Sequence, residues 1–120
     1  MHTVCQTPAF DRAARDAGMS EAEIERLVVF LSANPDAGVE MQGTGGCRKL
    51  RVAGRGKGKS GGYRTITFYS GDDMPVFLIT VFSKGERANL TAKERNALKS
   101  LSAALVDDYG ERSRKTGGVR

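Results

Sequence analysis

Histidine, cysteine and tryptophan are scarce in this chain of 120 residues, which holds one histidine, two cysteines and no tryptophan. Cys5 and Cys47 are far apart, and His2 stands next to the N-terminus. A structural zinc site needs about four Cys or His ligands and a catalytic one about three. We therefore expect no metal site and two reduced cysteines.

Long apolar runs are also missing. No stretch approaches the roughly 20 apolar residues that span a bilayer, and the first residues lack the basic and then apolar pattern of a secretory signal. We expect a cytoplasmic protein that does not bind membranes. The length suits one domain, which we place at residues 1–110, followed by a basic, disordered tail at residues 111–120.

Capping signals and apolar spacing predict three helices. A short helix is expected at residues 10–17. A second begins at Ser20, which has capping-box spacing to Glu23. Thr91 caps the last helix, which is expected to end at Gly110. The buried stripe of that helix is predicted to comprise Leu98, Leu101, Leu105 and Val106.

Alternating and β-branched residues predict the strands. They are expected at residues 4–7, 47–52, 62–69 and 75–83. The last of these is nearly all apolar and is predicted to be the central strand. In the strand before the glycine-rich loop, Cys47, Lys49 and Arg51 should share one face. The order of elements predicts an α+β domain with an antiparallel meander.

Positive charge is concentrated in the middle of the chain, whose net charge is +5. Residues 43–69 carry no acidic side chain and seven basic ones, namely Arg48, Lys49, Arg51, Arg55, Lys57, Lys59 and Arg64. Like charges at this density repel one another, so the segment indicates an anionic partner such as RNA. Tyr63 and Tyr69 are candidates for stacking on a base, and their spacing puts them on one face.

Nucleotide-binding motifs in the same segment are misleading. Residues 56–61 satisfy G-x-G-x-x-G, and Gly58-Lys59-Ser60 ends like a P-loop. Both motifs hold phosphate at the N-terminus of a following helix. A strand follows here instead, so we expect no nucleotide cofactor and no other cofactor.

Two stretches of the chain resemble the HigB branch of the RelE/ParE toxins. They are residues 43–64, which end in Gly62-Tyr63-Arg64, and residues 80–91. The resemblance runs from about residue 21 to residue 104. It implies the microbial RNase fold, with N-terminal helices packed on a twisted antiparallel sheet and a C-terminal helix. It also implies ribosome-dependent, metal-independent mRNA cleavage in the ribosomal A site and neutralisation by a cognate antitoxin.

Site residues follow from the resemblance by position. Lys49 and Arg51 match basic residues on the strand before Gly-Tyr-Arg, Arg64 matches the arginine of that element, and Lys84 matches a basic residue after the apolar strand. Leu90 stands roughly where RelE has a tyrosine, which leaves the general acid open. The residues expected to bind RNA around this centre are Arg48, Arg55, Lys57, Lys59, Tyr63 and Arg87.

RNA cleavage without a metal requires removal of a 2′-OH proton, stabilisation of the phosphate charge and protonation of the leaving oxygen. We expect Arg64 and Arg51 to stabilise charge, Lys49 or a loop lysine to act as base, and Lys84 to act as acid or second stabiliser. A lysine can act as a base where neighbouring cations lower its pKa. Two alternatives stay open: a ParE-like inhibitor of gyrase that cuts no RNA, and a non-catalytic RNA-binding module.

Overall fold

The computed structural model describes residues 2–54, 62–71, 73–84 and 89–119, with side chains up to residue 109. Five strands and three helices follow one another along this part of the chain. They are β1 (Val4–Gln6), α1 (Pro8–Ala17), α2 (Glu21–Ala33), β2 (Val39–Glu40), β3 (Cys47–Val52), β4 (Tyr63–Phe68), β5 (Val76–Ser83) and α3 (Ala92–Val119).

The five strands form one sheet in the order β1-β5-β4-β3-β2. β2, β3, β4 and β5 pair antiparallel, as expected, whereas β1 runs parallel to β5. The expectation of a wholly antiparallel sheet is therefore wrong at its first strand. β4 rather than β5 holds the middle position, because β3 and β2 lie on its other side. β2 is a two-residue strand that the sequence pattern does not predict.

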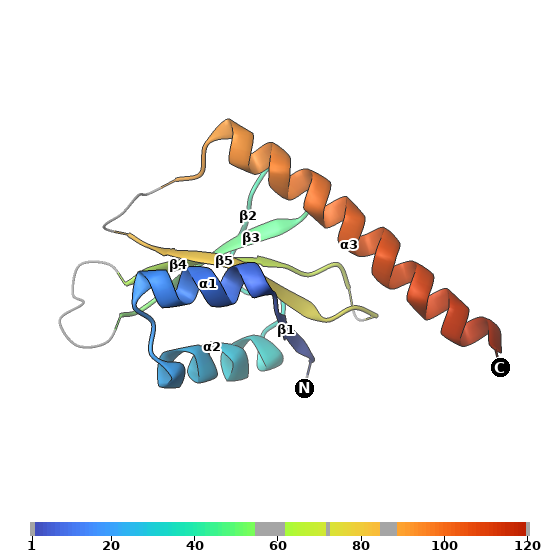
Figure 1. Ribbon diagram of the computed structural model, residues 1–120, viewed down its shortest axis with the longest axis horizontal. Helices are drawn as coiled ribbons and strands as arrows, with labels where there is room; N and C mark the ends of the chain where they lie inside the picture. Colours follow the sequence, from blue (N-terminus) through green and yellow to red (C-terminus); the bar gives the residue numbers. More distant parts are fainter. Residues whose placement is uncertain (1, 55–61, 72, 85–88, 120) are drawn as a thin grey trace.

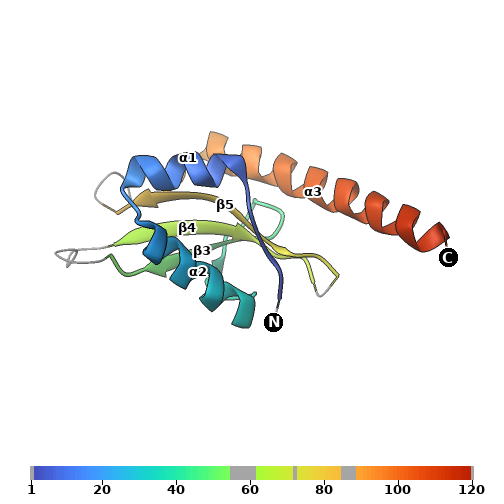
Figure 2. The same cartoon turned by 60° about the horizontal axis from the view of Figure 1, so that its bottom comes forward.

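Helices cover both faces of the sheet (Figure 1). α1 and α2 lie on one face, which comes forward in Figure 2, and α3 crosses the other. Each face has its own apolar cluster. Phe10, Leu27 and Leu31 pack on Val76, Leu78 and Val81 beneath α1 and α2. Cys47, Ile66, Phe68, Phe77 and Phe82 pack beneath Leu98 of α3.

Local signals fix the two N-terminal helices where the sequence places them. Thr7 caps α1 by accepting from the amide of Phe10 at 3.1 Å. Ser20 and Glu23 form both hydrogen bonds of the predicted capping box at the start of α2. The turn between the helices needs φ = +82° at position 18, and glycine adopts this conformation without a steric penalty.

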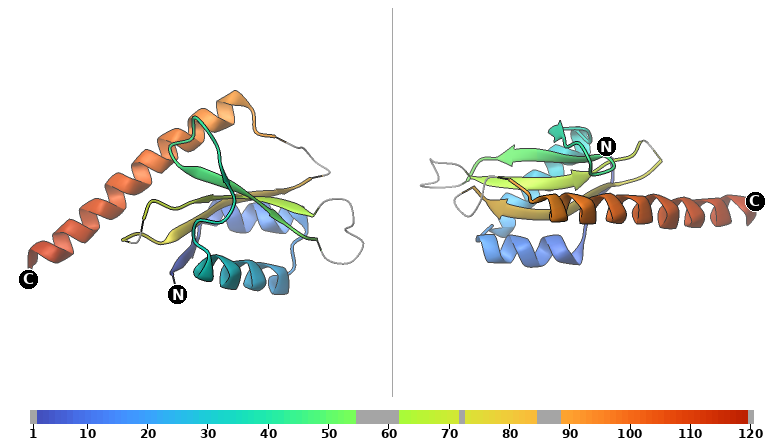
Figure 3. Two further views of the ribbon diagram at one scale, coloured as in Figure 1. Left: turned by 180° about the vertical axis from the view of Figure 1, so that it is seen from behind. Right: turned by 90° about the horizontal axis from the view of Figure 1, so that it is seen from above.

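α3 differs from its prediction at its far end. Its backbone stays helical to Val119, so the expected end at Gly110 is wrong. The helix extends beyond the edge of the sheet (Figure 3). Leu101 and Val106 are each 39% exposed, so the expected stripe is buried only in part. The division into a domain at residues 1–110 and a tail at residues 111–120 stays a prediction.

Candidate active site

Strand register brings two arginines opposite each other. Arg51 of β3 is the direct partner of Arg64 of β4, and Lys49 is the partner of Ile66. Ile66 belongs to the cluster beneath α3. Because side chains alternate along a strand, Lys49, Arg51 and Arg64 all belong to that face. The expectation that Cys47, Lys49 and Arg51 share a face is confirmed.

Lys84 reaches the same end of the sheet by backbone pairing. Phe82 is the partner of Arg64, and two residues later the amide of Lys84 donates to the carbonyl of Gly62 at 3.1 Å. A Cβ atom at Gly62 would lie 2.2 Å from the carbonyl oxygen of Val52. Glycine is therefore required just before β4, where the chain passes close to the end of β3.

The three cations on the α3 face line a hollow of about 390 Å³. Its walls are Gly38, Val39, Lys49, Leu50, Arg51 and Arg64, which include no carboxylate. Arg64 is only 7% exposed, Lys49 is half-buried and Arg51 is exposed. Like charges directly opposite each other in a sheet are destabilising. An anion bound between the guanidinium groups would offset this repulsion.

Asn89 is a contact that the sequence does not reveal. The ammonium of Lys49 donates to Oδ1 of Asn89 at 3.4 Å, across 40 positions of the chain. The following residue, Leu90, packs against the cluster beneath α3, and Thr91 caps that helix. A long-range bond of this kind leaves no local sequence signal, because it depends on the fold.

Arg48 and Tyr63 belong to the opposite face of the sheet. Arg48 alternates with Lys49 along β3, and its Nη1 donates to the carbonyl of Gly38 at 3.4 Å. The hydroxyl of Tyr63 donates to Glu23 of α2 at 3.4 Å. Burial raises the pKa of Tyr63, and the charge and hydrogen bond of Glu23 add to this. The structure does not bring either side chain together with Arg64.

Tyr69 packs in the same cluster as Tyr63, beneath α1 and α2. The two tyrosines thus share a face, as their spacing predicts, but it is the face away from the cationic hollow. The remaining residues expected to bind RNA are outside the described residues, namely Arg55, Lys57, Lys59 and Arg87. Their roles stay predictions.

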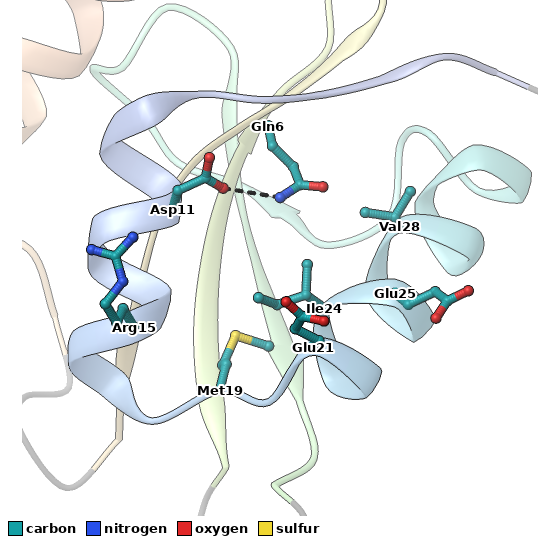
Figure 4. Close-up of a pocket in the computed structure, with 8 residues that line it drawn as sticks. All are labelled: Gln6, Asp11, Arg15, Met19, Glu21, Ile24, Glu25 and Val28. Carbon is teal, nitrogen blue, oxygen red and sulfur yellow. Dashed lines mark hydrogen bonds between the residues drawn. The ribbon is translucent and has the colours of Figure 1, made fainter.

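A larger hollow of about 600 Å³ lies between α1 and α2 (Figure 4). Its lining includes the carboxylates of Asp11, Glu21 and Glu25, with Arg15 as its one cation. Gln6 spans its upper part and donates to Asp11 at 2.9 Å (Figure 4). Carboxylates repel phosphate, so the smaller cationic hollow is the better candidate for RNA.

His2 has a structural place in the described fold. Its Nε2 is 2.7 Å from the carbonyl oxygen of Met74, and its ring packs edge-on against Tyr69.

Within the described ranges, no three His, Cys, Asp or Glu side chains gather as metal ligands. No helix in the same part of the chain is long and apolar enough to cross a bilayer.

The fold and its cationic hollow define a small α+β protein with a cation-lined site suited to an anion. A family described as the RelE toxin of the RelE/RelB toxin–antitoxin system matches residues 2–113. The chain belongs to this family, and it is therefore a toxin of a toxin–antitoxin system whose partner is an antitoxin.

One solved structure with the same fold is a mutant of the E. coli toxin RelE in the free state. It is 18% identical in sequence, with a TM-score of 0.50, and the match covers 82% of this chain and 94% of that chain. The expected α+β architecture is thereby confirmed.

Proposed function

We propose that this toxin cleaves mRNA on the ribosome through the cationic hollow, without a catalytic metal ion. The observation that carries the proposal is the direct pairing of Arg51 with Arg64 in a hollow that Lys49 also lines. Three cations repel a divalent metal ion but attract a phosphodiester. Arginine is also suited to bidentate contact with phosphate oxygens.

The reaction that fits these side chains is attack of a 2′-OH on its own phosphate. Lys49, or a lysine of the loop at residues 55–61, removes the 2′-OH proton, and Arg51 and Arg64 hold the equatorial phosphate oxygens. Lys84 donates a proton to the departing 5′-oxygen or adds to charge stabilisation. The products are a 2′,3′-cyclic phosphate and a 5′-OH.

Outer parts of the RNA are proposed to contact the glycine-rich loop. Arg55, Lys57 and Lys59 would meet phosphates as adjustable charges, and Arg87 would add a further cation. Arg48 and Tyr63 are left out because they lie on the other face. These loop cations also favour the HigB branch of the family. We place the activity in the cytoplasm, where a cognate antitoxin would neutralise the toxin.

An Arg64→Ala variant is the direct test. Loss of one charge-stabilising group lowers a rate by about 10²–10³-fold, so mRNA scission on translating ribosomes and growth arrest should both disappear. Because Arg64 is buried, Arg51→Ala serves as a second variant at an exposed position. Arg12→Ala, an exposed charge on α1, is the matched control and should stay active.

The ends of the RNA fragments test the chemistry. A 2′,3′-cyclic phosphate is expected, whereas 3′-OH and 5′-phosphate ends would rule out attack by the 2′-OH. A DNA supercoiling assay with gyrase separates the ParE-like alternative. Inhibition of gyrase together with intact mRNA would overturn the proposal.

A further inference from the structure

The position of Lys49 within the cationic hollow needs an explanation. It lies on one face of β3 with Arg51, two residues away, and Arg64 is the cross-strand partner of Arg51. Two neighbouring guanidinium groups repel an ammonium. A lysine side chain also has many alternative rotamers. Without a further contact, the ammonium would turn away from both arginines.

We propose that Asn89 is a positioning residue that holds the Lys49 ammonium at the cationic hollow. The inference rests on the proposed function. Its structural basis is the bond from Lys49 Nζ to Asn89 Oδ1, at 3.4 Å. Lys49 is half-buried, and within the part of the chain that the structure describes no carboxylate pairs with it.

The backbone of Asn89 is well placed for this task. Leu90 anchors it to the apolar cluster beneath α3. Thr91 then starts α3 with a reciprocal cap, in which its amide donates to Oε1 of Glu94 at 2.8 Å and its hydroxyl accepts from the Glu94 amide at 3.1 Å. The asparagine side chain therefore extends from a fixed point between β5 and α3.

A neutral acceptor suits a phosphate site better than a charged one. A carboxylate at position 89 would hold the ammonium more strongly, but it would neutralise the charge that the phosphate needs. The amide oxygen of Asn89 accepts a hydrogen bond and leaves the positive charge of Lys49 available. This difference between amide and carboxylate separates a positioning role from a merely structural one.

A double-variant experiment tests the coupling between the two residues. Wild type, Lys49→Ala, Asn89→Ala and the double variant are compared in mRNA cleavage on ribosomes. We expect Asn89→Ala to lower kcat by about 10-fold with KM within about twofold, since small misplacement of a catalytic group reduces rates steeply. The double variant should be no slower than Lys49→Ala alone.

Two further variants supply controls. Asn96→Ala, at an exposed position of α3, should keep the wild-type rate. The RNA used for binding carries a 2′-methoxy group at the scissile position. The affinity of Asn89→Asp for this RNA should be several-fold lower than that of the wild type. The slope of log affinity against log salt concentration should fall by the amount that corresponds to about one phosphate contact. Thermal unfolding should show the same Tm for all position-89 variants.

The outcomes separate the two proposals. The positioning role is overturned if the rate losses of the two single variants multiply in the double variant, or if Asn89→Ala cleaves at the wild-type rate. Neither result would affect the proposal that the wild type cleaves mRNA. A wild type that leaves mRNA intact overturns the proposed nuclease, and with it the positioning role of Asn89. Unchanged affinity of Asn89→Asp for the 2′-methoxy RNA likewise contradicts the inference.

Discussion

Removing the charge of Arg51 should make the protein more stable while it makes the toxin inactive. Arg51 faces Arg64 directly across β3 and β4. Cross-strand side-chain pairs contribute roughly 0.2–1 kcal/mol each, and like charges directly opposite each other are destabilising, so we take the same range for the repulsion. Arg51 is exposed, so solvent screening favours the lower half of this range. Arg51→Gln keeps a straight polar side chain and removes only the charge.

The expected gain is small but measurable. The unfolding entropy is roughly 2.1 cal/mol/K per residue, so for a chain of 120 residues 1 kcal/mol shifts Tm by roughly 4 °C, and about 0.5 kcal/mol predicts a rise of about 2 °C in dilute salt. The Debye length falls from about 30 Å at 0.01 M to about 3 Å at 1 M ionic strength. The gain should therefore nearly vanish in 1 M salt.

Arg51→Lys is the matched control, because it keeps the charge and loses the bidentate geometry. Its Tm should stay at the wild-type value, while both variants lose mRNA cleavage, Arg51→Gln more than Arg51→Lys. Scanning calorimetry at both salt concentrations provides the measurement. If Arg51→Gln is no more stable than Arg51→Lys in dilute salt, repulsion between the arginines is not a property of this fold.

Further predictions concern the packed interior. Thr67 is fully buried and its hydroxyl lacks a partner among the described residues, so Thr67→Val should raise the free energy of unfolding by about 1–2 kcal/mol in chemical denaturation. Ser102 is 3.3 Å from Cys47 Sγ and donates to a loop carbonyl at 3.1 Å, so Ser102→Ala should lower it by about 1 kcal/mol. The pKa of Tyr63 is raised above its usual 10.0 by burial and then by Glu23; Glu23→Gln should lower the pKa seen in phenolate absorbance. The pKa of Tyr63 is higher in the folded than in the unfolded protein. The contribution of Tyr63 to stability is therefore complete below pH 10 and declines as the pH rises through the folded pKa. Tyr63→Phe should remove this decline.

Local chemistry made most of the elements predictable. The capping pair of Ser20 and Glu23 acts within one helical turn, so it could be recognised without any knowledge of the fold. The strands β3, β4 and β5 carry their own alternation or apolar character. The face shared by Lys49 and Arg51 followed from the period of a strand.

Features that depend on distant partners could not be predicted. β2 is a strand only because Val39 and Glu40 pair with β3, and two residues show no periodicity. The parallel direction of β1 belongs to its pairing with β5, in which Val4 is the partner of Val76, and no local pattern encodes so distant a contact. The spacing of Tyr63 and Tyr69 correctly put them on one face, but only the packing under the helices decides which face that is.

The candidate site was predictable as a set of cations but not as a geometry. Arg64, Arg51 and Lys49 were expected together, and the register joins them in one hollow. Arg48 is adjacent to Lys49 in sequence, yet alternation places it on the other face. Charge density along a sequence therefore overestimates the number of cations that converge on one phosphate.

The position of α3 accounts for where the site lies. The helix is fixed over the end of the sheet that holds Cys47 and Phe77, through the bond of Ser102 to Cys47 and the edge-on contact of Tyr109 with Phe77. Arg51 and Arg64 lie at the opposite ends of their strands. Two like charges stand opposite each other at this end of the sheet, and Arg51 is exposed there, which is expected when local stability rules are broken for function. Substitutions under α3 should therefore change unfolding, whereas substitutions at the arginine end should change activity first.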